Sequence, residues 1–126
     1  MSHGLHMSMM IADIVILEAR KKGATYVSEI EIDLGKLACF SIKQIETYLM
    51  MRLENSVAEG AEVIINRIDP EAHCHDCSFE GKLLKISQDI DRIEFYEPLC
   101  PNCKSNSITI TKGKDCKLRS LKIINS

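Results

Sequence analysis

Two Cys-x-x-Cys pairs constrain this chain more than any other feature of its sequence. The pairs are Cys74 with Cys77 and Cys100 with Cys103, and 22 residues separate them. A turn with this spacing can place both sulfurs on one ion, at about 2.3 Å from a zinc ion, and two facing turns complete a closed tetrahedral site. The alternative is four unrelated buried or disulfide-bonded cysteines. The doubled spacing favours one structural metal site made by all four residues.

Zinc is the first interpretation of this site, and iron is its main rival. Soft thiolate ligands suit both metals. A four-cysteine site also holds the single iron of small electron-transfer proteins, and the spacing alone does not separate the two ions.

The composition indicates one ordinary globular domain plus a small module. The chain has 126 residues, of which 45% are hydrophobic and 27% charged. No run approaches the length of a membrane span, and the N-terminus lacks a basic region followed by an uninterrupted apolar stretch. We therefore expect a soluble cytoplasmic protein with no membrane partner. In that reducing compartment the two remaining cysteines, Cys39 and Cys116, are expected to be buried thiols that take no part in the metal site.

The charge balance argues against a nucleic-acid partner. The net charge is -2 and the pI is near 6.1, so the chain has no general attraction for a phosphate backbone. Basic residues do gather near the C-terminus, where they alternate with apolar ones as on the solvated face of a strand. They are Lys112, Lys114, Lys117, Arg119 and Lys122.

Apolar residues at spacings of three and four predict an amphipathic helix over about residues 5–22, ended by Gly23. Methionines at helical spacing are typical of core packing, so the thioethers of Met7, Met9 and Met10 are interpreted as packing groups rather than metal ligands. The stripe expected to face the core is Met7, Met10, Ile11, Ile14 and Leu17.

Strict alternation predicts a half-buried strand over residues 27–34, with Ile30, Ile32 and Leu34 on its apolar face. Ser41 is a predicted N-cap for a second helix over about residues 42–56. Further strands are expected over 61–66 and 118–124. The apolar stripe of the second helix is Ile42, Ile45, Leu49 and Leu53.

These elements predict an α+β fold with a three-stranded sheet, two helices on one face, and an inserted zinc-ribbon-like module with four cysteines. The C-terminal strand has no neighbour of its own, and a two-stranded sheet is marginally stable, so this strand should return to the first two. The predicted domains are residues 1–69 with 116–126, and a metal-binding module over 70–115. The module is too small to bury a sizeable core and should need its metal to fold.

The N-terminus offers a different kind of metal site. A free amine, backbone amides and the His3 imidazole lie within a few atoms of one another, and Ni(II) accepts a square-planar set of such nitrogens. If Met1 is removed, as the small Ser2 permits, Ser2 supplies the amine and His3 is the second residue. Taken alone, His3 and His6 are typical of frayed, exposed terminal residues.

The whole chain resembles a known family in several features taken together. They are His3 at the start of the first helix, Asp33-Leu34-Gly35 at the end of a strand, Ala-Glu-Gly-Ala at 58–61, the two cysteine pairs, and the ending at 118–123. On these features the chain resembles the HypA/HybF family, the nickel metallochaperones that help to mature [NiFe]-hydrogenase.

The resemblance implies roles for particular residues. His3 matches the nickel-binding histidine of the family, and Cys74, Cys77, Cys100 and Cys103 match its structural zinc ligands. Two positions depart from the usual pattern, because Gly4 replaces the acidic residue after the histidine and Lys36 stands where relatives often carry Glu.

The resemblance also implies partners. They are the GTPase HypB and the hydrogenase large subunit, and because some relatives serve urease, also urease maturation factors. The protein is expected to be a monomer or a weak homodimer.

An enzyme is not expected. The sequence has no nucleophile elbow, phosphate-binding glycine loop or paired-carboxylate motif, and a closed four-thiolate site has no open position for substrate. His73 and His75, which flank Cys74, are interpreted as supporting or exposed groups rather than ligands. The alternatives left open are a zinc-ribbon interaction or nucleic-acid-binding module and a four-cysteine iron electron-transfer protein.

Overall fold

The structure of the protein is a computed structural model. It describes residues 3–38, 41–83, 85–88, 94–96 and 99–125, with side chains from Leu5 onward except within 84–98. The chain divides into two compact units. The first comprises Met1–Leu34, Ala38–Asn66 and Cys116–Ser126, and the second comprises Gly35–Leu37 and Arg67–Asp115.

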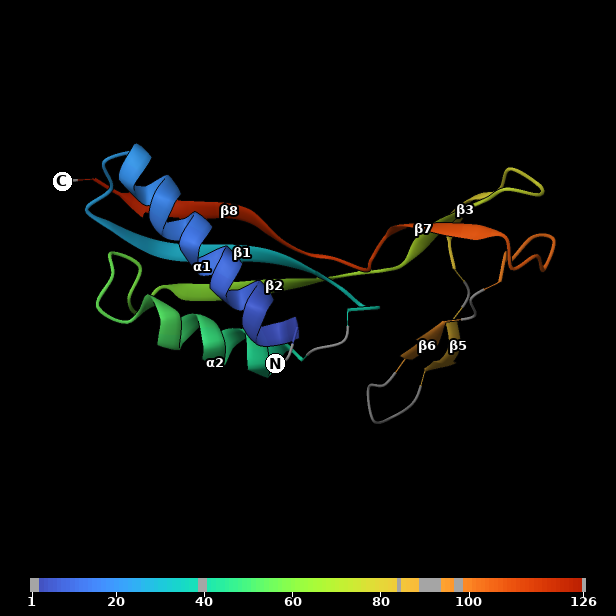
Figure 1. Ribbon diagram of the computed structural model, residues 1–126, viewed down its shortest axis with the longest axis horizontal. Helices are drawn as coiled ribbons and strands as arrows, with labels where there is room; N and C mark the ends of the chain where they lie inside the picture. The colour runs from blue at the N-terminus through green and yellow to red at the C-terminus, as the bar shows by residue number, and fades with distance from the viewer. Residues whose placement is uncertain (1–2, 39–40, 84, 89–93, 97–98, 126) are drawn as a thin grey trace. The chain divides into compact units, whose positions relative to one another are not determined.

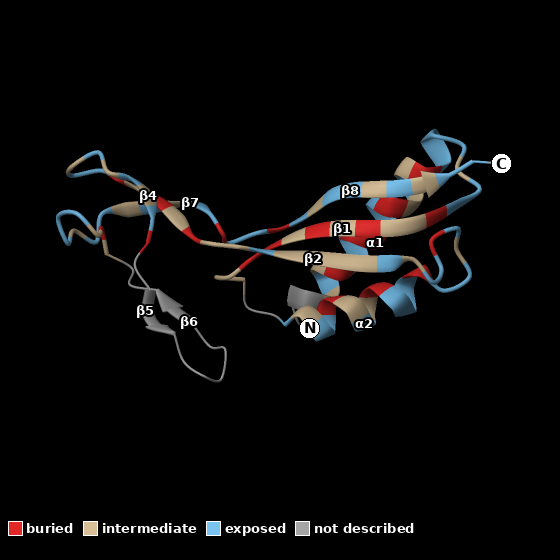
Figure 2. Cartoon of the chain, turned by 180° about the vertical axis from the view of Figure 1, so that it is seen from behind, coloured by how far each residue is buried: buried red, intermediate tan, exposed pale blue. Residues whose placement is uncertain are grey.

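The first unit is a three-stranded sheet covered by two helices. Its sheet has the order β2-β1-β8, with β8 antiparallel to β1. Figures 1 and 2 show both helices on the same face of this sheet. The predicted α+β fold is therefore confirmed. The elements are α1 (His3–Lys21), β1 (Tyr26–Gly35), α2 (Ile42–Leu53), β2 (Glu62–Ile68) and β8 (Cys116–Ile124).

The register of β8 on β1 contains a bulge that keeps the core apolar. Glu31 pairs with Ser120 and Ile32 with Leu118, which leaves Arg119 without a partner in the ladder. The extra residue lets Leu118 and Leu121 both pack against the core although they are three positions apart. The basic side chains of β8 lie on the opposite, exposed face, as predicted.

The centre of the core is β1, whose apolar face is buried as the alternation predicts. Ile30, Ile32 and Leu34 have no exposed surface, and Figure 2 shows buried residues along this central strand. Burying each such side chain contributes about 1.5–3 kcal/mol. From α2 the same core receives Ile45 and Leu49, so the predicted stripe of that helix is correct.

The buried face of α1 differs from the predicted one. Ile11, Ala12, Val15 and Ala19 are buried, whereas Met10, Ile14 and Leu17 are 48%, 43% and 53% exposed. The small Ala12 and Ala19 allow the helix backbone to approach its neighbours closely. A periodic pattern that counts only large apolar side chains does not reveal a buried face made partly of alanines. The core-packing interpretation is also wrong for Met9 and Met10, which are exposed, while Met7 packs partly buried against the core.

The start of α2 and the end of α1 both carry the residue types expected there. The Ser41 hydroxyl accepts a hydrogen bond from the Gln44 N–H at 3.1 Å, and the Ser41 N–H donates to the Gln44 side chain at 3.3 Å, which forms a capping box. Gly23 follows α1 with φ +62°, and Ala24 donates to the Ala19 carbonyl at 3.0 Å. This is a Schellman ending. α2 ends at Leu53, a few residues before the predicted end.

The second unit is built from short strands that carry the four cysteines. Its larger sheet has the order β4-β3-β7 and its smaller one pairs β5 with β6. The strands are β3 (Glu71–Cys74), β4 (Glu80–Lys82), β5 (Lys85–Gln88), β6 (Glu94–Tyr96) and β7 (Ile108–Lys112).

In the described residues no helix has the length and hydropathy needed to cross a membrane.

Two glycines allow three backbone segments of the second unit to lie against one another. A Cβ atom on Gly35 would overlap the carbonyl of Gly113. A Cβ atom on Gly113 would lie 2.6 Å from the Cα of Pro70, and Gly113 also has φ +92°. The segments are joined by hydrogen bonds from the Leu37 N–H to Gly113 and from the Lys36 N–H to Ile68, at 2.8 and 2.9 Å.

Lys36 strengthens the same junction through its side chain. Its ammonium lies 2.8 Å from the Asp69 carboxylate, which Lys82 also approaches at 3.3 Å. The hydrogen bond from Lys36, followed by that from Lys82, lowers the pKa of Asp69 to about 2. The lysine that departs from the family pattern therefore has a structural partner in this chain.

Replacing Gly35 by Ala should destabilise the protein by about 3 kcal/mol, because the new methyl group meets a backbone carbonyl that cannot move aside easily. Thermal unfolding of the full chain measures this. Gly23→Ala is the matched control. It adds a methyl group in open space at a positive φ and should cost only about 1 kcal/mol. Equal losses in the two variants would contradict the close approach at Gly35.

Candidate metal centre

The structure brings the sulfurs of the two Cys-x-x-Cys pairs into one cluster. The Sγ atoms of Cys74, Cys77, Cys100 and Cys103 all lie within 4.8 Å of one another. Two of the distances between pairs are 3.7 Å, from Cys74 to Cys103, and 3.6 Å, from Cys77 to Cys100. Four sulfurs arranged tetrahedrally at 2.3 Å from an ion are about 3.8 Å apart. The cluster therefore fits a four-coordinate metal.

The two turns that carry the cysteines have the same backbone geometry. In each turn the N–H of the first cysteine donates to the carbonyl five residues later, and the carbonyl of that cysteine accepts from the N–H four residues later. The fourth residue after each first cysteine, Ser78 or Lys104, has a φ near +65°. The bonds are Cys74 to Phe79 (2.8 Å), Ser78 to Cys74 (3.1 Å), Cys100 to Ser105 (2.8 Å) and Lys104 to Cys100 (2.9 Å).

N–H donors lie close to three of the four sulfurs. The backbone N–H of Asp76 lies 3.4 Å from the Cys74 sulfur, and that of Asn102 lies 3.3 Å from the Cys100 sulfur. The Asn102 side chain crosses to the other pair and donates to the Cys77 sulfur at 3.4 Å. Hydrogen bonds to a charged group stabilise it.

Two thiols of the cluster, Cys77 and Cys103, differ in how readily they ionise. The hydrogen bond from Asn102 lowers the pKa of Cys77 to about 6. For Cys103 a backbone hydrogen bond from Ser105 lowers the pKa, but desolvation and the neighbouring sulfurs outweigh it and raise that pKa to about 12. The Cys103 thiol therefore favours its protonated form near neutral pH. Metal binding must displace protons and becomes weaker as the pH falls.

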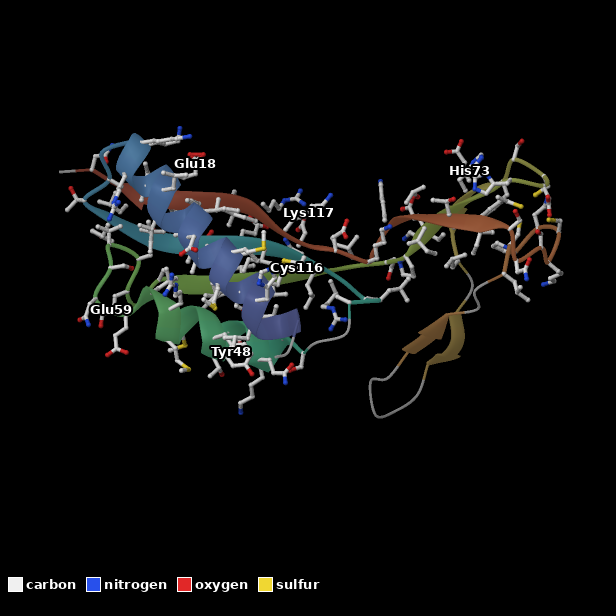
Figure 3. All side chains as sticks on the ribbon, in the orientation of Figure 1. Glu18, Tyr48, Glu59, His73, Cys116 and Lys117 are labelled. Carbon is white, nitrogen blue, oxygen red and sulfur yellow. The ribbon has the colours of Figure 1, made fainter. Side chains whose placement is uncertain are left out.

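The two histidines beside Cys74 have partners of their own. His75 Nε2 lies 2.6 Å from the Thr109 hydroxyl, and His73 Nδ1 lies 3.9 Å from the Glu80 carboxylate. Their rings meet edge to face at 5.1 Å, and Figure 3 labels His73. Among the described residues, the group of converging ligand atoms contains the four cysteine sulfurs and neither imidazole.

The other predicted residues lie elsewhere. Cys116 is buried at the start of β8, where desolvation raises the pKa of its thiol to about 11. Cys39 falls outside the described residues. His3 is the first residue of α1, but its side chain and residues 1–2 also lie outside the described part, while His6 is exposed. The nickel site predicted there stays a prediction.

Sequence reasoning missed Asn102 and the contact that links the two turns. Asp76 accepts a hydrogen bond from the Ser105 hydroxyl, so each turn supplies a polar group to the other. Asn102 and Asp76 lie within the Cys-x-x-Cys turns, and this position is the one signal in the sequence that could have marked them. Their partners are about 25 to 29 residues away along the chain, and spacing does not reveal such contacts.

The sheet with its two helices and the separate four-sulfur cluster define a small α+β metal-binding protein. The family model described as "Hydrogenase/urease nickel incorporation, metallochaperone, hypA" matches residues 2–123. The chain belongs to this HypA family. Metallochaperones of this family are not enzymes.

Individual relatives agree with this assignment. The chain is 28% identical over 123 residues to hydrogenase maturation factor HypA of Methanothermobacter thermautotrophicus, covering 96% of both chains. It is 28% identical over 119 residues to hydrogenase maturation factor HybF of Klebsiella pneumoniae, covering 94% of this chain and 96% of the relative. The solution structure of the Ni metallochaperone HypA from Helicobacter pylori has the same fold, with a TM-score of 0.65, 21% identity and coverage of 95% and 98%.

Replacing Asn102 by Ala should raise the pKa of Cys77 and thereby increase proton competition for the site. We expect zinc affinity near pH 6 to fall about tenfold, with a smaller loss at pH 8, because supporting hydrogen bonds to metal ligands contribute on this scale. Competition with a chromogenic chelator across pH measures this effect. Asn106→Ala, an exposed residue of the same unit, is the control. A loss that is the same at both pH values would contradict the proposed role of the Asn102 hydrogen bond.

Proposed function

We propose that this chain binds Ni(II) through its N-terminus, with His3 among the ligands, and delivers the ion during maturation of a [NiFe]-hydrogenase. The observation that carries the proposal is membership of the nickel-incorporation family over residues 2–123, a match that includes His3. The names of the relatives, hydrogenase maturation factors HypA and HybF, support the same role.

The start of α1 at His3 supports this use of the terminus. The first N–H groups of an α-helix have no partner within the helix. An amide there can lose its proton to Ni(II) without breaking a helical hydrogen bond. Together with the terminal amine and the imidazole, such amides make the square-planar nitrogen set that Ni(II) accepts. A short ligand set at a chain end also releases an ion more readily than a closed cage does.

We propose that the four-cysteine cluster holds a structural zinc ion. The converging sulfurs and their N–H donors suit a closed tetrahedral site, and zinc thiolate sites of this kind stabilise small folds. The same donor set also suits iron, so metal analysis of the isolated protein decides between the two ions. On this proposal the zinc supports the second unit, and the cargo nickel binds in the first.

The proposed partners are the GTPase HypB and the hydrogenase large subunit, with urease maturation factors as further candidates from the family description. The proposed compartment is the cytoplasm. The five cysteines that the structure describes are free thiols, which suits a reducing environment.

The nickel proposal is tested with untagged protein whose N-terminus has been verified by mass spectrometry. His3→Ala should abolish the single tight nickel site measured by calorimetry and leave zinc content unchanged. His6→Ala, which changes an exposed histidine in the same helix, is the matched control and should bind nickel like the parent. A double variant of Cys74 and Cys77 to Ala should lose zinc and unfold the second unit, because the closed site contributes folding free energy.

The outcome for His3→Ala decides between the classes of function. If this variant binds nickel as the parent does, the N-terminal site is wrong, and a zinc-ribbon interaction protein is the better account. A coloured, redox-active iron protein would instead support electron transfer. Retention on nucleic acid at moderate salt, independent of His3, would support a nucleic-acid-binding module.

A further inference from the structure

The helix α1 carries an apolar surface that the core of this chain does not use. Met7, Met10 and Ile14 line an open groove of about 540 Å³ between α1 and β8. Met10 and Ile14 are 48% and 43% exposed. The opposite wall and floor come from β8, where Leu118 and Leu121 contribute apolar side chains. α1 therefore has one apolar side in the core and a second beside the sheet.

The groove lies at an edge of the sheet. Among the described strands β8 pairs with β1 alone, so the other side of β8 is an edge of this sheet. Figures 1 and 2 show the C-terminal part of α1 extending past this edge. Figure 3 labels Glu18 on α1 and Cys116 and Lys117 on β8, three residues of the groove lining. A strand added beside β8 would lie under this overhanging helix.

We propose that the groove between α1 and the outer edge of β8 is a docking surface for an extended, acidic segment of a partner protein, which joins the sheet as an additional strand. An extended peptide that adds to a sheet edge gains backbone hydrogen bonds, and its alternate side chains give specificity. The apolar side chains of the segment would enter the groove against Met10 and Ile14. The surface does not depend on nickel bound at the N-terminus.

Charge favours an acidic segment over a neutral or basic one. Three of the four charged residues in the groove lining are basic, Lys22, Lys117 and Arg119, against one Glu18. Arg119 already pairs with Asp33 at 2.9 Å on the outer face of the sheet. Opposite-charge pairs between neighbouring strands are stabilising and like-charge pairs are destabilising.

The existing neighbour of β8 shows what pattern this strand accepts. On β1, Ile30 and Ile32 face the core. The alternate residues Glu31 and Asp33 face the other way and pair with Arg119 on the exposed face of β8. A segment with the same alternation of apolar and acidic residues suits the other side of β8. A second copy of β8 itself would instead bring two sets of lysines onto one face, which disfavours pairing between copies.

The test uses the zinc-loaded full chain and two synthetic peptides with the same nine-residue length as β8. One alternates Ile with Glu, and the other alternates Ile with Lys. We expect the Glu peptide to bind in a fluorescence anisotropy titration and to slow hydrogen exchange of β8 backbone amides. The Lys peptide should bind at least ~10-fold more weakly, since it meets like charges in neighbouring positions.

Two exposed apolar residues provide matched variants. Ile14→Glu places a charge against the apolar side chains of the peptide and should weaken binding of the Glu peptide about tenfold or more. Met50→Glu changes a residue of α2 that is 66% exposed and does not line this groove, and should leave binding unchanged. Thermal unfolding and zinc content confirm that both variants are folded.

Three results would overturn the proposal. The first is no binding of the Glu peptide at concentrations up to the millimolar range. The second is equal binding of the Glu and Lys peptides, or equal loss in Ile14→Glu and Met50→Glu, which would indicate nonspecific adhesion. The third is a dimer in sedimentation experiments that is abolished by Ile14→Glu, since the occupant would then be a second copy of this chain.

Discussion

The pairing of β8 with β1 is the interaction on which the rest of the structure depends. The chain leaves the first unit after β2, forms the cysteine-bearing unit, and returns only at Cys116. The ladder between β1 and β8 then closes a very long loop, whose entropic cost rises only slowly with length. The apolar face of β8 repays that cost by completing the core. The first unit is therefore complete only after the chain has passed through the second unit.

A similar dependence holds inside the second unit. Its strands are short, and each Cys-x-x-Cys turn satisfies its own backbone while directing two sulfurs to the common centre. The turns are linked to each other by Asn102 and by the hydrogen bond from Ser105 to Asp76. Small units of this kind have little apolar surface to bury and gain stability from such closed sites. The glycines at 35 and 113 then allow the segments that enter and leave the unit to lie close together.

The parts of the fold that could be predicted from the sequence are those with a strong local signal. Strict alternation identified β1 and its buried face, and Ser41 with a spaced apolar stripe identified α2. The family likeness, carried by the cysteine pairs together with His3, could also be predicted. The orientation of α1 could not, because its buried face relies on Ala12 and Ala19, which contribute little to apolar periodicity. The contacts of Asn102 and Asp76 were hidden because their partners are distant in sequence. The strands of the second unit are too short for an alternating pattern of apolar and polar residues to reveal them.

The four cysteines are not equally shielded, and this bears on how fast an ion can leave or enter. Cys74 and Cys100, the first residues of the two turns, are buried, whereas Cys77 is half-buried and Cys103 exposed. The cluster thus has one closed side and one side that faces solvent. A competing thiol or chelator can approach through the Cys103 side and replace sulfurs one at a time. An ion held tightly at equilibrium could still exchange quickly, because tight binding and slow exchange depend on different features of the site.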